Sequence, residues 1–172
     1  KKIKVAISGD GADELFGGYP RYRYISKFWE KLEKSPRFFI RNMKEISYVF
    51  SSSNLKILRS LGKKARKYSH DDIESLYNDQ LSRWRPDEGM YDTDNISSSN
   101  FNKFLKFKKT KISNYRYLML RDFITYLPSN LLVKIDRASM ANSLEVRSPY
   151  LDPSLVKFVW ALPDDYIKNN NI

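Results

Sequence analysis

One short apolar segment at the amino end constrains the fold of this chain more than any other feature. Ile3 to Ser8 is rich in β-branched residues and is stopped by Gly9, a composition that predicts a buried β-strand. No second stretch of comparable strand character follows in the 172 residues. A single strand cannot satisfy its backbone groups, so we expect its partner strands to lie outside this chain. The segment therefore predicts the carboxy-terminal piece of an α/β domain.

The chain after Gly18 has the apolar spacing of α-helices almost throughout. This spacing predicts helices at Arg21 to Lys34, Pro36 to Phe50, Asn54 to Lys67, Asp71 to Trp84, Phe101 to Lys108, Asn114 to Leu127, Leu131 to Ser143 and Pro153 to Leu162. Proline, glycine and serine interrupt the spacing at Ser51 to Ser53 and at Arg85 to Asn100, which we predict to be loops. We therefore expect a mostly α fold with one short parallel strand at the amino end.

Composition limits the classes of protein to which the chain can belong. Hydrophobic residues make up 41% of it, enough to build a packed core in one domain or part of one. The sequence has neither an apolar run of membrane-spanning length nor a signal-peptide pattern, so we expect a cytoplasmic protein. Because it has no cysteine, it cannot form disulfides, thiolate metal sites or a cysteine nucleophile of its own.

A formal net charge of +11 raises the question of a polyanionic partner. The basic residues are mixed with glutamates and with apolar residues at helical spacing, which favours solvated helix faces over a nucleic-acid stripe. Neither a zinc-finger spacing nor a leucine-zipper repeat supports the second interpretation. We expect no nucleic-acid partner, and a basic nucleic-acid-binding module remains the alternative of a different class.

The segment "SGDGADELFGGY" that follows the strand carries the chemistry of the chain. Ligands bind at the carboxyl ends of strands in open α/β sheets, where Gly9 and Gly11 would let the backbone approach a nucleotide. Ser8 adds a hydroxyl group. The carboxylates of Asp10, Asp13 and Glu14 would repel a bare phosphate, so they predict a bound divalent cation, for which Mg²⁺ with nucleotide phosphates is the usual solution.

A structural explanation of the same segment carries equal weight on spacing alone. In that interpretation Asp10 and Asp13 cap a short helix from Ala12 to Phe16, and Gly17 and Gly18 end it.

A second segment of the sequence agrees with the first. "SGDGADELFGGYPRY" and "YLPSNLLVKIDRASMANSLEVRSPYLDPSLVKFVWALP" together resemble the synthetase domain of the glutamine-dependent asparagine synthetases. The resemblance implies the helical carboxy-terminal portion of an α/β adenine-nucleotide alpha-hydrolase-like (PP-loop) domain, with residues 1–172 as a partial asparagine synthetase domain. The S-G-G-x-D-S PP-loop and the amino-terminal glutaminase domain of that family are absent from the sequence.

The resemblance also implies an activity and its substrates. Family members use ATP and Mg²⁺ to adenylate the side-chain carboxylate of aspartate, and ammonia released from glutamine by the glutaminase domain then displaces AMP to give asparagine. We expect the 172 residues alone to be inactive as this ligase. Relatives that amidate a sugar acid for polysaccharide synthesis, or that close a ring as β-lactam synthetases do, remain alternatives, and a homodimer is left open.

Individual roles follow from the resemblance at matching positions. Ser8, Gly9 and Gly11 correspond to the nucleotide-contacting turn, and Asp10 to the acid linked to acyl-adenylate formation. Asp13 corresponds to a Mg²⁺ ligand, with Glu14 beside it in a supporting position.

Four further polar residues come from later in the chain. Arg137 corresponds to a cation near the reacting phosphates, and Lys134, one turn earlier, is either a second such cation or a helix-surface residue. We expect Glu145 and Arg147 to form a structural ion pair. His70 belongs to an acidic helix start and is expected to be part of a cap rather than a ligand.

Overall fold

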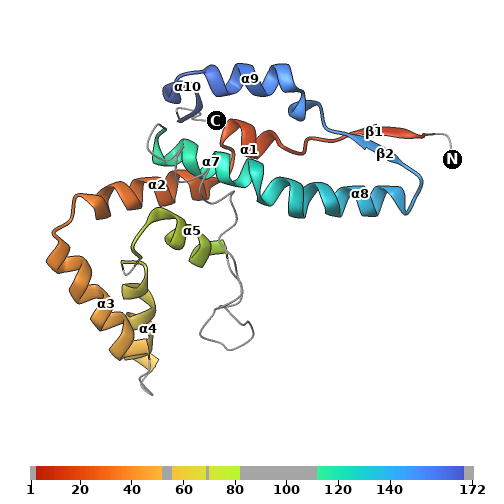
Figure 1. Cartoon of the computed structure of the whole chain (residues 1–172). Helices are drawn as coiled ribbons and strands as arrows, with labels where there is room; N and C mark the ends of the chain where they lie inside the picture. The colour runs from red at the N-terminus through yellow and green to blue at the C-terminus, as the bar shows by residue number, and fades with distance from the viewer. Residues whose placement is uncertain (1–2, 52–55, 69, 82–111, 169–172) are drawn as a thin grey trace. The chain divides into compact units, whose positions relative to one another are not determined.

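A computed structural model describes residues 3–51, 56–68, 70–81 and 112–168 of the chain (Figure 1). These residues are mostly helical, as predicted. They fall into two compact units, the first formed by Lys1–Arg23 with Ser98–Ile172 and the second by Tyr24–Ser97. Helix α2 (Pro20–Glu33) begins in the first unit and continues into the second.

The first unit contains a pair of parallel strands, β1 (Val5–Ile7) and β2 (Glu145–Arg147). Ala6 lies opposite Val146, and the amide of Ser8 donates to the carbonyl of Arg147 at 2.9 Å. The expectation of a lone strand is therefore wrong, because β1 has a partner within this chain. Sequence patterning missed β2 because its one apolar residue stands between two charged ones.

Helix α7 (Asn114–Ile124) contributes much of the buried core of the first unit. Helix α1 (Ala12–Phe16) lies against α7, and its Leu15 is fully buried. Tyr117, Leu118 and Met119 of α7 are also fully buried, so the aromatic and aliphatic content of this helix forms the core of the unit.

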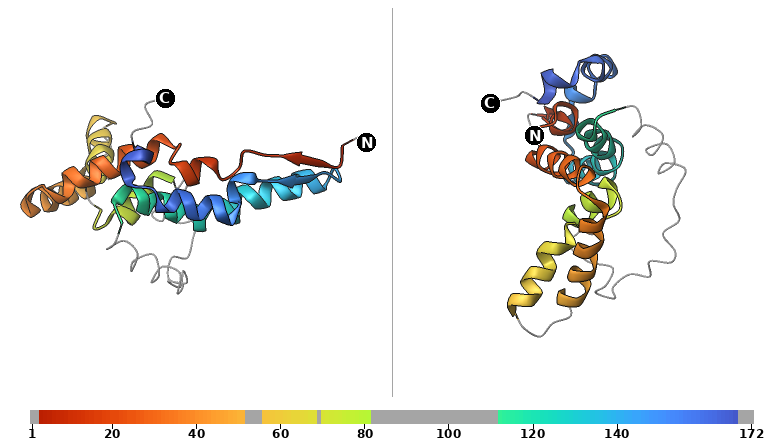
Figure 2. Two further views of the ribbon diagram at one scale, coloured as in Figure 1. Left: turned by 90° about the horizontal axis from the view of Figure 1, so that it is seen from above. Right: turned by 90° about the vertical axis from the view of Figure 1, so that its left-hand side faces the viewer.

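Helix α7 ends earlier than the predicted Leu127, and the chain continues as a π-helical segment, η3 (Leu127–Leu132), into α8 (Val133–Met140). Pro128 explains the change, because it has no N–H to donate to a helix carbonyl. The hydroxyl of Thr125 also donates to the carbonyl of Arg121, at 2.6 Å, where α7 ends. Figures 1 and 2 show α8 running alongside the strand pair, and it packs on β2.

The carboxy-terminal segment consists of a 3₁₀ turn, η4 (Pro149–Leu151), followed by α9 (Pro153–Ala161) and α10 (Asp164–Lys168). Asp152 caps α9 by accepting hydrogen bonds from the amides of Ser154 and Leu155 at 2.8 and 3.2 Å. The predicted helix from Pro153 to Leu162 is thus confirmed to within one residue at its end.

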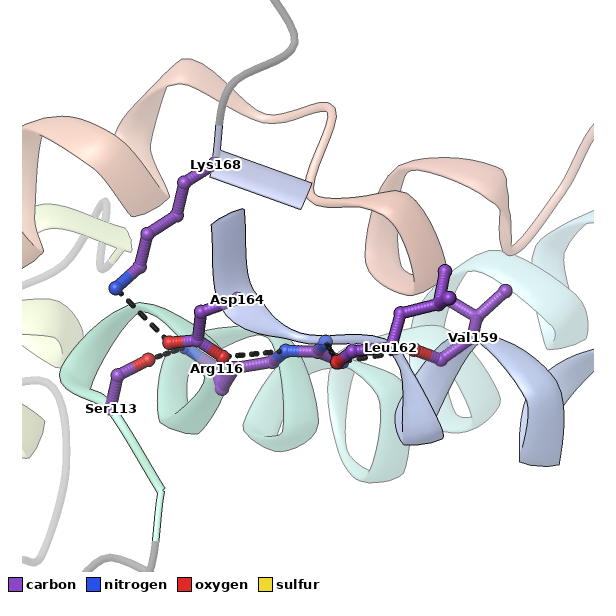
Figure 3. Close-up of polar contacts among 6 residues, drawn as sticks. All are labelled: Ser113, Arg116, Val159, Leu162, Asp164 and Lys168. Carbon is purple, nitrogen blue, oxygen red and sulfur yellow. Dashed lines mark hydrogen bonds and ion pairs between the residues drawn. The ribbon is translucent and has the colours of Figure 1, made fainter. Parts of the chain in front are cut away.

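A buried arginine joins these carboxy-terminal helices to α7 (Figure 3). The guanidinium of Arg116 donates to the carbonyls of Val159 and Leu162, where α9 ends, and to the carboxylate of Asp164, where α10 begins. Asp164 also accepts hydrogen bonds from Ser113 and Lys168. One side chain therefore satisfies the ends of two helices at once.

The second unit contains the rest of α2 together with α3 (Arg37–Ser51), α4 (Lys56–Arg66) and α5 (Ile73–Leu81). Helices α3 and α4 lie side by side (Figure 1). Tyr68 contacts the rings of both Phe28 and Phe39. The predicted helix at Phe101 to Lys108, the predicted loop at Arg85 to Asn100 and the end of the helix predicted to reach Trp84 lie outside the described residues.

The cap of α5 differs from the expectation for His70. Asp72 caps the helix, accepting a hydrogen bond from the amide of Ser75 at 2.7 Å. His70 is instead half-buried, with its Nε2 3.6 Å from the carboxylate of Asp79, and burial lowers its pKa. Among the helices in the described ranges, none is both long enough and apolar enough to cross a membrane.

Candidate functional site

The candidate site begins at the turn that follows β1. The hydroxyl of Ser8 donates to the carboxylate of Asp10, and the amide of Asp10 points back to the Ser8 hydroxyl at 3.4 Å. Asp10 is therefore oriented by Ser8 and does not cap α1, whose N-cap residue is Gly11 without any side-chain cap. The capping explanation of Asp10 and Asp13 is wrong, although the short helix from Ala12 to Phe16 is confirmed.

The glycines of the motif fall into two groups. Gly11 and Gly17 have φ angles of 87° and 72°, which other residues adopt only with strain. A Cβ at Gly11 would also overlap Cδ2 of Leu151 and lie 3.2 Å from its Cγ, and one at Gly17 would overlap the hydroxyl of Tyr115 and lie 3.0 Å from its ring. Gly9 differs, since it has no positive φ and its added Cβ would meet nothing within 4 Å in the part of the chain that is described. Packing within these residues therefore gives no reason for glycine at position 9.

The two neighbouring acids of α1 have different environments. Asp13 is exposed, whereas Glu14 is only 1% exposed and accepts a hydrogen bond from the hydroxyl of Tyr19 at 3.0 Å. Burial raises the pKa of Glu14, and the nearby charges of Asp13 and Asp122 raise it further. Of the two predicted metal-site carboxylates, only Asp13 faces solvent.

A buried polar cluster that sequence reasoning missed stands next to Glu14. The carboxylate of Asp122, on α7, accepts hydrogen bonds from Arg21 at 2.6 Å and from Tyr22 at 2.8 Å. The guanidinium of Arg21 lies 3.8 Å from the centre of the Tyr19 ring, a cation–π contact. These residues are about a hundred positions apart in sequence, so no local pattern could have joined them.

The predicted cations lie on a separate helix. Lys134 and Arg137 are both exposed on α8, where residues three apart lie on one face. Neither forms an ion pair within the described residues, so both charges are available to a ligand. Helix α8 follows the π-helical segment η3, a rare geometry that often marks functional sites. Leu127, the first residue of η3, would lie 3.7 Å from a Cβ at Gly11, so the two halves of the motif pack together there.

The predicted ion pair between Glu145 and Arg147 is confirmed, with Arg147 Nε 2.8 Å from Glu145 Oε1. Side chains two residues apart on a strand project from the same face, which brings these two together. Both are well exposed, so the pair adds little to stability.

The described residues fit Mg²⁺ through a single carboxylate. Among them there is no group of three or more acidic, histidine or cysteine side chains that could enclose a metal ion. Mg²⁺ nevertheless keeps several water ligands and is commonly held by one or two carboxylates together with substrate phosphates. An exposed Asp13 beside an open glycine turn is compatible with that kind of binding.

A comparison with protein families decides where the chain belongs. The profile described as asparagine synthase matches residues 1–172, the whole length of the sequence. This chain belongs to the asparagine synthase family. The recognition from the two motif segments is thereby confirmed.

Curated members of the asparagine synthase family give the same result. The chain is 29% identical to asparagine synthetase [glutamine-hydrolyzing] 1 of Bacillus subtilis, over 99% of this chain and 26% of that protein. It is 28% identical to a putative asparagine synthetase [glutamine-hydrolyzing] of Mycobacterium tuberculosis, over 95% of this chain and 24% of that protein. The chain therefore spans about a quarter of the length of these relatives. No solved structure gives a significant match.

Proposed function

We propose that this chain is part of an ATP-dependent ligase that amidates the side-chain carboxylate of aspartate. In the first step a carboxylate oxygen of aspartate bonds to the α-phosphorus of ATP, and pyrophosphate leaves with the electrons of the broken P–O bond. In the second step ammonia, supplied from glutamine, attacks the acyl carbon of β-aspartyl-AMP. AMP leaves, a proton is lost and asparagine remains.

The observation that carries this proposal is the open backbone at Gly9. The residue stands at the carboxyl end of a parallel strand, where ligands of α/β sheets bind. Nothing in the described fold occupies the space of a Cβ there, so glycine is best explained by the approach of something that is not part of these residues. A ribose or phosphate of ATP is the group that the family membership favours.

The residues of the turn have different roles in binding ATP and aspartate. Ser8, Gly9 and Gly11 form the nucleotide-facing backbone, and Asp10, held by the Ser8 hydroxyl, presents an oriented carboxylate to the reacting acyl group. Asp13 is the Mg²⁺ ligand, and the bound ion would neutralise phosphate charge. Glu14, which is buried, supports the turn without contacting the ion.

The exposed cations of α8 provide charge for the leaving group. Among the described residues, neither Lys134 nor Arg137 forms an ion pair with a carboxylate. In this proposal both cations bind the departing pyrophosphate. The phosphate-binding PP-loop and the glutaminase activity belong, in this proposal, to other segments of the protein. The proposed fold is accordingly part of a PP-loop α/β domain in a cytoplasmic enzyme.

The test is an assay of the complete protein with ATP, Mg²⁺ and glutamine. We expect AMP and asparagine to form in equal amounts when aspartate is present. AMP formation only with a sugar acid or a β-amino acid precursor would move the enzyme to a different member of the family. Salt-dependent binding to generic DNA without any binding of ATP would contradict the proposal and favour the basic-module interpretation.

A single substitution connects the assay to the structure. Gly9→Ala should leave the melting temperature unchanged, because the added methyl meets no described atom. It should weaken ATP binding by about tenfold, a loss typical of one misplaced contact. Unchanged ATP affinity in this variant would remove Gly9 from the nucleotide site.

A further inference from the structure

The turn after α1 has a feature that the proposed function does not use. Gly18 is exposed and has no positive φ, so its backbone conformation is open to other residues. A Cβ at Gly18 would nevertheless overlap the Oδ1 atom of Asp13 and lie 3.1 Å from its Cγ. The carboxylate of Asp13 therefore occupies the space that any side chain at position 18 would need.

The same turn is fixed from its other side. The carbonyl of Asp13 accepts hydrogen bonds from the amides of Gly17 and Gly18, the second at 3.0 Å. Glu14 and Tyr19, which bracket the two glycines, are joined by their hydrogen bond of 3.0 Å. The backbone of Gly18 is thus held next to Asp13, and the Asp13 carboxylate packs against the Cα of Gly18.

We propose that Gly18 is a positioning residue, whose bare Cα sets the conformation in which the Asp13 carboxylate meets the metal ion. The inference rests on the proposed role of Asp13 as a Mg²⁺ ligand. It goes beyond that role, because Gly18 itself offers no ligand atom towards the ion. The hydrogen bond between Glu14 and Tyr19 keeps the turn closed and so maintains the contact between Gly18 and the Asp13 carboxylate.

Gly18→Ala separates this role from a role in folding. The atom that the new methyl overlaps is the end of a rotatable side chain, so the chain can accept the methyl by swinging the Asp13 carboxylate away, with a small backbone shift because the methyl would lie 3.3 Å from the Asp13 Cα. The variant should keep a melting temperature near that of the unchanged protein. Substitutions that misorient a metal ligand typically cost 10- to 100-fold in metal affinity, and we expect about tenfold here.

The experiment is a double-substitution cycle with Mn²⁺ as the probe. Mn²⁺ binding to the complete protein is measured by electron paramagnetic resonance in the presence of a non-hydrolysable ATP analogue, for the unchanged protein, Gly18→Ala, Asp13→Ala and the double variant. We expect each single variant to bind Mn²⁺ more weakly. Gly18→Ala should then cause no further loss in the Asp13→Ala background, because its effect acts through the carboxylate.

The outcomes distinguish failure of the inference from failure of the proposed function. Unchanged Mn²⁺ binding in Asp13→Ala would remove Asp13 from the metal site and with it the basis of the proposed role. A loss in Asp13→Ala but none in Gly18→Ala would overturn the inference about Gly18 alone. A melting temperature lowered by Gly18→Ala in both backgrounds would identify a backbone effect and contradict the inference as well.

Discussion

Glu14 is a buried acidic residue next to the proposed metal ligand. It follows the exposed Asp13 directly in α1, yet its carboxylate is buried and bonded to Tyr19. Burying a carboxylate is costly, and the raised pKa of Glu14 reflects that cost. Glu14 therefore holds the Tyr19 hydroxyl in place at a cost in stability when its carboxylate is ionised.

The pH dependence of stability tests this view of Glu14. Because burial raises its pKa above the ordinary value of 4.5, the folded state binds its proton more tightly than the unfolded state. Its contribution to stability is thus greatest at low pH and falls as the pH rises from 4.5 through the folded-state pKa. Glu14→Gln, which keeps an oxygen acceptor for Tyr19, should remove this fall.

Urea unfolding of both proteins across that pH range gives the measurement. The free energy of unfolding of Glu14→Gln should increase relative to the unchanged protein as the pH rises, and then level off. Glu30→Gln, at an exposed carboxylate of α2, controls for the loss of one negative charge. A stability difference that stays constant with pH would show that ionisation of Glu14 is not coupled to folding.

At the scale of secondary-structure elements, Arg116 joins three helices. Its guanidinium reaches the last carbonyls of α9 and the first carboxylate of α10 from within α7 (Figure 3). Burial alone would raise the pKa of Asp164, but hydrogen bonds from Ser113, Lys168 and Arg116 hold it below its ordinary value. Arg116 and Asp164 therefore both have further hydrogen-bond partners besides each other.

Arg116→Met should destabilise the protein by about 1–3 kcal/mol, since it leaves the carbonyl of Leu162 without this donor, while the partly exposed Asp164 keeps Lys168 as a partner. The loss should appear as a lower melting temperature with faster amide exchange in α9 and α10. Asp164→Asn, which keeps an acceptor at a partly exposed position, is the matched control and should cost much less. An equal loss of stability in the two variants would contradict the conclusion that Arg116 holds the three helices together.

The elements also show what could be predicted from sequence. Apolar spacing placed α2, α3 and α9 well, because a helical period is a property of the local sequence, and in α2 it corresponds to a buried face of Tyr22, Ile25, Trp29 and Leu32. The π-helical segment could not be predicted from periodicity, since its hydrogen-bond pattern changes locally around Pro128, which has no N–H. Ser8 and Asp10 were recognisable from a local motif, whereas the cluster around Asp122 depends on contacts between distant segments.

At the scale of the whole chain, the two strands join its beginning to its end. The amide of Ser8 bonds to Arg147, and that of Glu145 bonds to Lys4, both at 2.9 Å. Because its two members are far apart in sequence, forming this strand pair costs loop-closure entropy and is slow. It is also short, so it should open more easily than the helical core around α7.

Arg147→Pro tests whether the pairing behaves as one unit. The backbone groups of Glu145 and Arg147 face β1, whereas those of Val146, between them, point away from it. Proline at position 147 therefore removes an N–H from the side of β2 that pairs with β1. We expect the amides of Ser8 and Glu145 to lose hydrogen-exchange protection together, while those of α9 keep theirs. Arg147→Ala, which keeps the N–H but also loses the side chain, is the control, and loss of protection at Glu145 alone would contradict a coupled pair.

The pairing of β1 with β2 also affects how the protein is made. The ribosome releases β1 long before it has translated β2, and at about 5–20 residues per second the interval is on the order of ten seconds. During that time Val5 and Ile7 form an apolar strand whose hydrogen-bonding edge has no partner from this chain. During synthesis this edge is therefore open to pairing with another chain, and the positive charge of the neighbouring Lys4 opposes such pairing.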